Sequence, residues 1–288
     1  MQKQTTLKKI LHFFLVKIIL GIFIIGGLVF GVEWSGNSLL DKSSLSDYSK
    51  NLIMAAAAAA IALTGYIFLF RAYENRRINE LSAATFLKNA IAGTATGIIL
   101  QSLFILVIFI TGGYSIIRVN PVSFLIPPFT AALLAGFVAE ILIIGVFFRI
   151  VEEWFGTKIA IIVITILFAI LHINSAGATF LSVATTAVAA GFLLSAAYVA
   201  KRSLWLPIFI HFGWDFAEPG LYGAFNPGIS IKQPLLTSQV TGSTLLTGGI
   251  TGPQHSIQAL ILCSITGILF LYLAKRNNNF INSRFLVT

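Results

Sequence analysis

The stretch Ala131-Ala-Leu-Leu-Ala-Gly-Phe-Val-Ala-Glu-Ile-Leu-Ile-Ile-Gly-Val-Phe-Phe148 decides the class of fold, because it is apolar over its whole length except for one carboxylate, Glu140. An uninterrupted apolar run of about 18 residues or more is long enough for an α-helix to cross the hydrocarbon core of a bilayer. The stretch therefore predicts a transmembrane helix that carries an ionisable group inside the membrane.

The composition extends this prediction to the whole chain of 288 residues, of which 57% are hydrophobic and 10% are charged. This share of charged residues is well below the about 25% of soluble domains. The mean hydropathy is +0.91. These values exclude a water-soluble globular protein, and the sequence has neither the charge of a disordered chain nor a collagen repeat nor sustained coiled-coil heptads. We predict an all-α polytopic membrane protein.

Eight apolar segments are predicted to form about eight transmembrane helices in one bundle. They cover approximately residues 11–32, 51–70, 89–112, 124–150, 158–174, 177–200, 203–217 and 256–274. We expect a single membrane domain over residues 1–288, with a motif-bearing core at about 124–217 and a long outer loop at about 218–255. This loop is either a lid over a site or an inserted loop, and we favour the inserted loop because loop length costs little entropy.

The basic residues predict the orientation of the chain. The net charge is +9, and with the N-terminus inside, the outer segments contain few basic residues: Lys42, Lys50, Arg118 and Lys232. This asymmetry follows the positive-inside rule and places both termini in the cytoplasm, in a multi-pass protein of the plasma membrane. Membrane lipid is then the expected partner of the basic rim, and no nucleic acid is expected. The single cysteine, Cys263, excludes an internal disulfide and a cysteine-ligated zinc cluster.

Small residues predict close contacts between helices. Gly93 and Gly97 have the GxxxG spacing, and alanine and glycine are clustered over residues 187–191. Such positions allow neighbouring transmembrane helices to approach each other closely.

Four ionisable residues within predicted spans are candidates for function, since charged groups are costly in the membrane. They are Glu140, His172, His211 and Asp215. At about 1.5 Å per residue from Arg149, Glu140 is expected near mid-membrane. Arg149 falls on the opposite face of the same helix, so Glu140 needs a partner on another span or stays protonated.

The spacing of these residues suggests two kinds of chemistry. His211 and Asp215 are four residues apart, so on a helix their side chains share one face. Together they hold either one metal ion or one water molecule. Alternatively, the carboxylate orients the imidazole. His172, His211 and Asp215 are candidate ligands for a divalent metal such as zinc, and a carboxylate is the candidate general base. Taken singly, each histidine is more often an interhelical hydrogen-bonding residue.

Four further polar residues have simpler interpretations. Glu152 and Glu153 lie past the end of a span, and we interpret them as a solvated helix end. His12 and His255 fall at span ends and are interpreted as interfacial residues.

The order of the motifs resembles the CPBP family of intramembrane proteases, which includes the type II CAAX prenyl endopeptidases and bacterial relatives linked to bacteriocin self-immunity. The family pattern is Glu-Glu-x-x-x-Arg, then Phe-x-x-x-His, then His-x-x-x-Asn or Asp, in an eight-span bundle. Here the second motif is Phe168 to His172 and the third is His211 to Asp215. The neighbouring stretches Val146-Phe-Phe-Arg-Ile-Val-Glu-Glu-Trp-Phe-Gly156 and Ser203-Leu-Trp-Leu-Pro-Ile-Phe-Ile-His211 are also similar to the family.

The first motif departs from the family pattern. Alignment on Gly145 puts Ala139 where the family has its first glutamate, Glu140 on the second glutamate, and Ile144 where the family has arginine. In the family the first glutamate is the one usually assigned to water activation. The resemblance therefore implies a site that has lost or altered its chemistry, although the other four polar residues remain.

Three functions follow from these observations. The first is a membrane-embedded peptidase, with Glu140, His172, His211 and Asp215 as catalytic residues and a peptide or membrane protein as substrate. Here Glu140 is the base, the two histidines are metal ligands or stabilise an oxyanion, and Asp215 is a ligand or orients a histidine. The second is a catalytically inactive member of the family that acts as a membrane binding or immunity protein. The third is a transporter that uses the same residues as a proton or ion relay.

Overall fold

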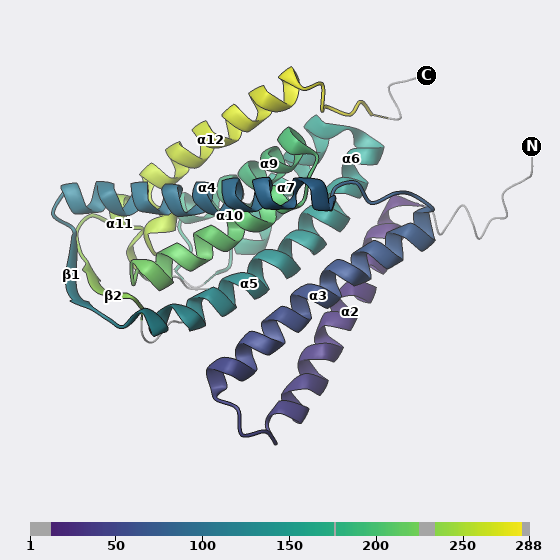
Figure 1. Cartoon of the computed structure of the whole chain (residues 1–288). Helices are drawn as coiled ribbons and strands as arrows, with labels where there is room; N and C mark the ends of the chain where they lie inside the picture. Colours follow the sequence, from purple (N-terminus) through teal and green to yellow (C-terminus); the bar gives the residue numbers. More distant parts are fainter. Residues whose placement is uncertain (1–12, 176, 225–233, 284–288) are drawn as a thin grey trace, which may run out of the picture.

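The computed structural model describes residues 13–175, 177–224 and 234–283, and it confirms an all-α polytopic membrane fold (Figure 1). The long helices are α2 (Phe14–Leu40), α3 (Asp47–Glu74), α4 (Ala83–Ile110) and α12 (Ile257–Arg276). Between α4 and α12 the chain forms α5 (Ile126–Glu140), α6 (Arg149–Phe155), α7 (Thr157–His172), α8 (Phe180–Thr186), α9 (Leu194–Lys201) and α10 (Trp205–Phe216). The first twelve residues, with His12, and residue Lys232 lie outside the described residues.

Every predicted span corresponds to a helical segment, but the helices differ in length. Within the described ranges, six continuous helices are long and apolar enough to cross a membrane. The predicted spans at 158–174 and 203–217 correspond to shorter helices. There α7 has 16 residues and α10 has 12, so α7 reaches only about 24 Å at 1.5 Å per residue, short of a hydrocarbon core about 30 Å thick.

In the part of the chain that the structure describes, three π-helical segments interrupt the bundle helices. They are η2 (Ile141–Phe148) between α5 and α6, η3 (Ala187–Leu193) between α8 and α9, and η4 (Ala217–Leu221) after α10. A π-helical segment widens the helix locally and shifts the direction of the side chains beyond it, and such segments are frequent at functional sites. Glu140 and Asp215 stand at or just before the start of two of them.

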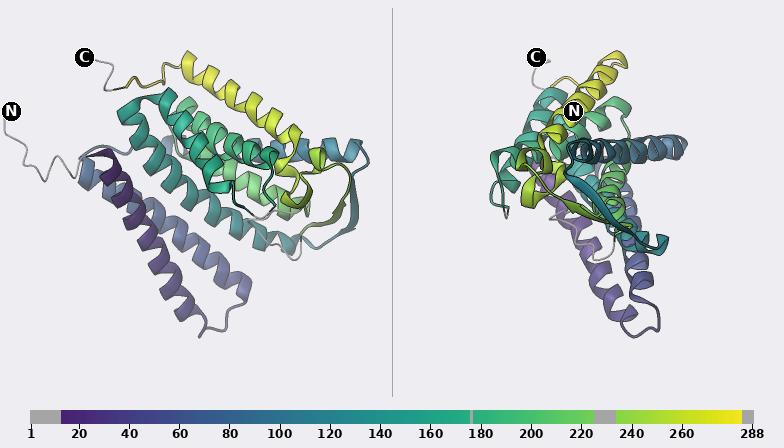
Figure 2. Two further views of the ribbon diagram at one scale, coloured as in Figure 1. Left: turned by 180° about the vertical axis from the view of Figure 1, so that it is seen from behind. Right: turned by 90° about the vertical axis from the view of Figure 1, so that its left-hand side faces the viewer.

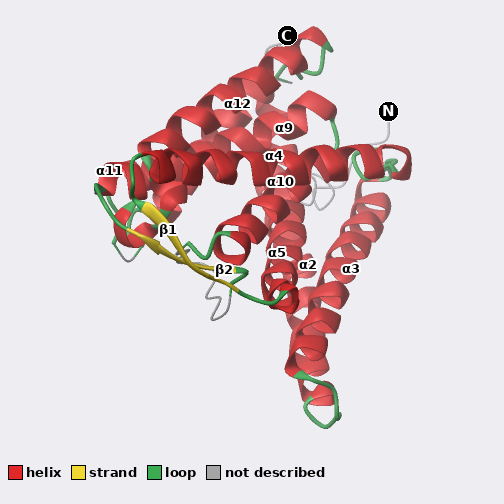
Figure 3. Ribbon diagram, turned by 60° about the vertical axis from the view of Figure 1, so that its left-hand side comes forward, coloured by secondary structure: helices red, strands yellow, loops and turns green. Residues whose placement is uncertain are grey.

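Helix α10 lies at the centre of the bundle, where it packs against α4 and α5. Figure 2 shows α12 along one side of this bundle, whereas α2 and α3 form a hairpin that diverges from it. The turn between α2 and α3 lies well away from the other helices (Figure 3). The part of α2 near this turn presents large apolar side chains outward, among them Phe30 and Trp34, as expected for a surface that faces lipid.

Glycines bring α10 into backbone contact with its neighbours, which confirms the predicted close approach at Gly93 and Gly97. A Cβ atom on Gly97 would lie 2.3 Å from the Ile210 carbonyl oxygen and 2.6 Å from the Trp214 nitrogen. On α5, a Cβ atom on Gly136 would lie 2.9 Å from the Ile208 carbonyl oxygen. A side chain at these positions would push α10 away, so the glycines set where its polar residues lie.

The alanine and glycine cluster at 187–191 also packs closely. A Cβ atom on Gly191 would lie 2.7 Å from the Cα atom of Thr165 on α7. The cluster thus brings η3 against α7, as the sequence predicted.

An ionic cluster joins the helix ends near the chain termini. Glu74, at the end of α3, accepts hydrogen bonds from Lys17 on α2 at 2.6 Å, Arg76 at 2.7 Å and Arg149 on α6 at 2.9 Å. Burying any one of these charges alone would cost free energy, and the opposite charges in the cluster compensate this cost.

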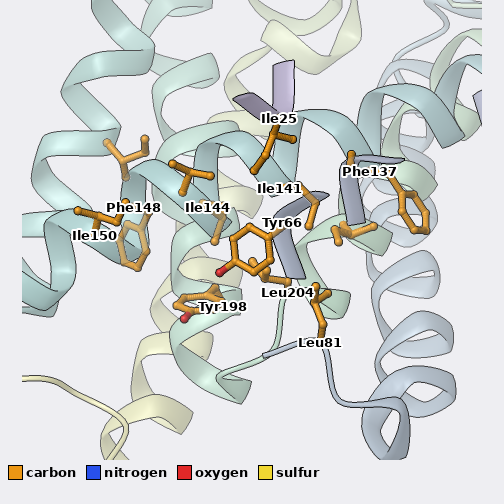
Figure 4. Packing of buried hydrophobic residues seen from close by; sticks show 14 of the residues in the cluster. Ile25, Tyr66, Leu81, Phe137, Ile141, Ile144, Phe148, Ile150, Tyr198 and Leu204 are labelled. Atoms are coloured by element: carbon orange, nitrogen blue, oxygen red, sulfur yellow. The ribbon is translucent and has the colours of Figure 1, made fainter. Parts of the chain in front are cut away.

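Next to this cluster, the side chain of Tyr66 contacts polar groups with its hydroxyl and apolar groups with its ring. Its ring is fully buried beside Ile144 and Leu204 (Figure 4), and its hydroxyl lies 2.6 Å from Glu80 Oε1. Glu80 also binds Arg76. Burial opposes ionisation of this carboxyl, but the hydrogen bonds from the Arg76 guanidinium hold the pKa of Glu80 below its usual range.

The interpretation of Glu152 and Glu153 as a solvated helix end is wrong for Glu152. Its side chain is 1% exposed and accepts hydrogen bonds from Arg202 at 2.5 Å and from the Thr157 hydroxyl at 2.6 Å. Glu153 pairs with Arg149 at 2.5 Å. Arg202 follows α9 and is 50 residues further along the chain, so the position of Glu152 beyond the span did not reveal this pairing.

The predicted outer loop contains ordered structure. Strand β1 (Tyr114–Val119), which follows α4, pairs antiparallel with β2 (Leu236–Val240) in the loop. The loop continues through α11 (Thr244–Thr247) and two short 3₁₀ turns, η5 (Gly249–Thr251) and η6 (Pro253–His255). Thr251, Gln254 and His255 of these turns line the cavity of the candidate site. The interpretation as an inserted loop stays a prediction, and residues 225–233 lie outside the described ranges.

The close contact between α4 and α10 gives a testable prediction. We expect Gly97→Ala to lower the free energy of unfolding by about 2 kcal/mol, because its Cβ atom would overlap the backbone of α10. Gly26 on α2 is the matched control, since a Cβ atom there would have no neighbour within 4 Å. Unfolding in mixed micelles, followed by tryptophan fluorescence, measures both; equal stability of the two variants would contradict the proposed contact.

Candidate functional site

Glu140 ends α5 and is buried, with 1% of its surface exposed. Its Oε1 accepts a hydrogen bond from Nδ1 of His211 on α10, at 2.8 Å. Arg149 instead pairs with Glu74 and Glu153. The expectation that Glu140 takes its partner from another span, and not from Arg149, is confirmed.

His211 lies between two carboxylates. Its Nδ1 faces Glu140, and its Nε2 lies 3.3 Å from Asp215 Oδ2, one helical turn further along α10. Both ring nitrogens donate together only when the imidazole carries two protons. The three side chains therefore form one coupled unit, in which a proton held by the ring compensates the charge of the carboxylates.

A cavity of about 550 Å³ lies next to this unit. Its wall includes His211 and Asp215 from α10, His172 from the end of α7, and apolar side chains such as Phe168 and Leu193. A mainly apolar cavity with a few convergent polar groups is the usual form of a ligand site in proteins. The structure thus brings three of the four predicted site residues to one cavity.

Glu140, the fourth predicted residue, stands behind His211 and is not part of the cavity wall. Its second oxygen, Oε2, is buried and has no hydrogen-bond partner among the described residues. This placement gives Glu140 direct access to the imidazole but not to a molecule in the cavity. It makes Glu140 a positioning residue for His211 in this geometry.

His172 is oriented by its own helix. Its Nδ1 lies 2.9 Å from the carbonyl oxygen of Phe168, and its ring stacks on the ring of that residue. Because a carbonyl oxygen only accepts hydrogen bonds, Nδ1 carries the proton, and Nε2 of the neutral ring is an acceptor. A ligand in the cavity would meet this second nitrogen.

The arrangement does not fit the predicted metal site at His172, His211 and Asp215. Among the described residues, no group of three or more His, Cys, Asp and Glu side chains is arranged to hold a metal ion. Both ring nitrogens of His211 face carboxylates, so neither is directed at a shared ion together with His172. Binding of zinc or another divalent metal stays a prediction, and the chemistry below uses no metal.

Sequence reasoning missed two residues of this region, His255 and Glu218. His255 was interpreted as interfacial, but it lines the cavity. Burial holds the pKa of His255 below its usual range, although its hydrogen bond to the Thr251 carbonyl opposes this effect. Glu218 follows Asp215 by three residues and is fully buried; its position at the start of the predicted outer loop gave no signal of this burial.

The fold and the cavity define an integral membrane protein of several apolar helices with a buried histidine and carboxylate site. A family model described as type II CAAX prenyl endopeptidase Rce1-like matches residues 121–217. This segment carries the site, and the match confirms the resemblance to the CPBP family that the sequence motifs indicate. Searches of curated proteins and of solved structures found no match.

The accessibility of the cavity can be measured on α7. We expect His172→Cys to react with a water-soluble methanethiosulfonate at least about tenfold faster than Ile164→Cys, because Ile164 lies on the same helix but is fully buried. The native Cys263 is buried and remains as an internal reference. Equal rates at the two positions would show that the cavity does not admit water.

Proposed function

We propose that the protein is a membrane-embedded endopeptidase that hydrolyses a peptide bond of a membrane-associated polypeptide. The observation that carries this proposal is the Glu140–His211–Asp215 unit, which presents an imidazole and a carboxylate to a cavity that is mainly apolar. The family match over the same residues supports it. The integral membrane location is that of a multi-pass protein, and we propose the plasma membrane, with both termini in the cytoplasm.

The side chains have distinct roles in this proposal. Asp215 takes a proton from a water molecule, whose oxygen attacks the carbonyl carbon of the peptide bond. As the C–N bond breaks, His211 gives the proton on Nε2 to the leaving amine nitrogen, and Asp215 passes the proton taken from water back to this ring nitrogen. Glu140 holds the imidazole in position from its far side. The base is thus Asp215 in place of Glu140, because Asp215 lines the cavity.

His172 faces the cavity from another helix. Its Nδ1–H is used by the Phe168 carbonyl, so the ring stabilises an oxyanion only when Nε2 is protonated as well. As a neutral ring, His172 is a hydrogen-bond acceptor for the substrate. We assign it to substrate binding.

A second candidate function is supported by the position of Ile144. This residue, which replaces the arginine of the family pattern, is fully buried in the apolar cluster with Tyr66 and Leu204. The core is therefore built around an apolar side chain where the family pattern has a charge. A catalytically inactive protein that binds a peptide or membrane partner in the cavity is the corresponding proposal.

Cleavage of a fluorogenic peptide library in liposomes tests the two candidates. For a peptidase, we expect His211→Ala and Asp215→Asn to reduce turnover at least about 100-fold, the usual contribution of a general acid or base. Ile268→Ala, on an exposed face of α12, is the control and should cleave like the parent.

The variant Ala139→Glu with Ile144→Arg separates the candidates further. Cleavage by this variant and not by the parent would support the inactive binding protein. Equal turnover of the parent, His211→Ala and Asp215→Asn would contradict the assigned roles.

A further inference from the structure

The segment 249–255 of the outer loop is fixed against the end of α10. Glu218 Oε1, in η4, accepts a hydrogen bond from the backbone nitrogen of Gln254 at 2.9 Å. The Gln254 side chain in turn accepts one from the indole nitrogen of Trp214 at 3.0 Å. These two bonds join the loop segment to the same helix that carries His211 and Asp215, so the segment is a wall of the cavity with a defined position.

This wall presents His255 to the cavity. Its Nδ1 lies 2.6 Å from the Thr251 carbonyl oxygen, and its Nε2 lies 3.0 Å from the Thr186 hydroxyl. As in His172, the carbonyl requires the proton on Nδ1, which makes Nε2 of the neutral ring an acceptor. The cavity therefore contains two imidazoles in the same tautomer, each with its Nε2 as acceptor.

The contact between His255 and Thr186 is incompletely satisfied. The Thr186 hydroxyl also lies 2.9 Å from the carbonyl oxygen of Ser182, to which it donates within its own helix. A hydroxyl has one hydrogen, so it cannot donate to the carbonyl and to His255 Nε2 together. A ligand with an N–H donor can satisfy His255 while Thr186 keeps its bond to Ser182.

We propose that His255 is a substrate-binding residue of the cavity and that it accepts, together with His172, hydrogen bonds from main-chain N–H groups of an extended polypeptide. An extended chain offers such donors at regular intervals, with apolar side chains between them for walls such as Phe168 and Val183. The choice of a polypeptide rests on the proposed function. The position of His255 and the acceptor role of its Nε2 are independent of the proposed function.

Peptide retention tests this proposal without requiring turnover. The Asp215→Asn protein, which lacks the proposed base, is incubated in nanodiscs with a library of random decapeptides, and the retained peptides are quantified by mass spectrometry. We expect His255→Ala in this background to weaken retention about tenfold, which corresponds to one hydrogen bond of about 1.4 kcal/mol. His255→Gln, which keeps an acceptor, should restore part of it, and N-methylated decapeptides should be retained weakly by all variants.

Thr186→Val separates binding from a structural role. If His255 only holds the loop, removal of the Thr186 hydroxyl should weaken retention as much as His255→Ala does. If His255 binds peptide, Thr186→Val should retain peptides at least as well as its parent. Thermal midpoints of all variants show whether each one is folded.

The proposal would be overturned if His255→Ala left peptide retention unchanged. It would also be overturned if Thr186→Val lost as much retention as His255→Ala, or if no folded variant retained peptides. Retention that depends on His255, without cleavage by the parent protein, would contradict the peptidase function and leave the binding role of His255 in place.

Discussion

The burial of the Glu140 carboxylate inside the bundle is the constraint on which the site depends. An ionised carboxylate away from water is very unfavourable unless a partner compensates it. The hydrogen bond from His211 provides that partner, and it requires α5 and α10 to keep a fixed register. Asp215 on the next turn of α10 then faces the other nitrogen of the same ring, so one interhelical bond positions all three groups.

The register of α10 is set by backbone contacts at glycines, whereas ionic contacts hold the ends of other helices together. Gly97 and Gly136 allow α4 and α5 to approach α10 from two sides. The ionic cluster around Glu74 joins α2, α3 and α6 away from the cavity. The paired charged residues discussed above therefore lie in two places: those of the Glu74 cluster join helix ends, and Glu140, His211 and Asp215 lie at or behind the cavity wall.

The sequence was sufficient to predict the membrane class, the helical segments, the close contacts at the glycines and the partnership of Glu140 with another span. Each of these follows from local patterns, such as apolar length, GxxxG spacing and the cost of a buried charge. The length of α7, the burial of Glu152 and the place of His255 did not follow, since they depend on contacts between residues far apart in the chain. The ion pair of Glu152 with Arg202 and the hydrogen-bond contact of His255 with Thr186 form only when the chain folds.

The placement of Glu140 behind His211 was also beyond sequence reasoning, because adjacent helix positions differ by about 100° in direction. A double-mutant cycle between Glu140→Gln and His211→Gln measures the coupling on which the account rests, through the free energies of unfolding of the parent, the two single variants and the double variant. We predict a coupling energy of at least about 1.5 kcal/mol, in the range found for residues that share a hydrogen bond. Additive effects, with a coupling near zero, would contradict the account and show that the two side chains act independently.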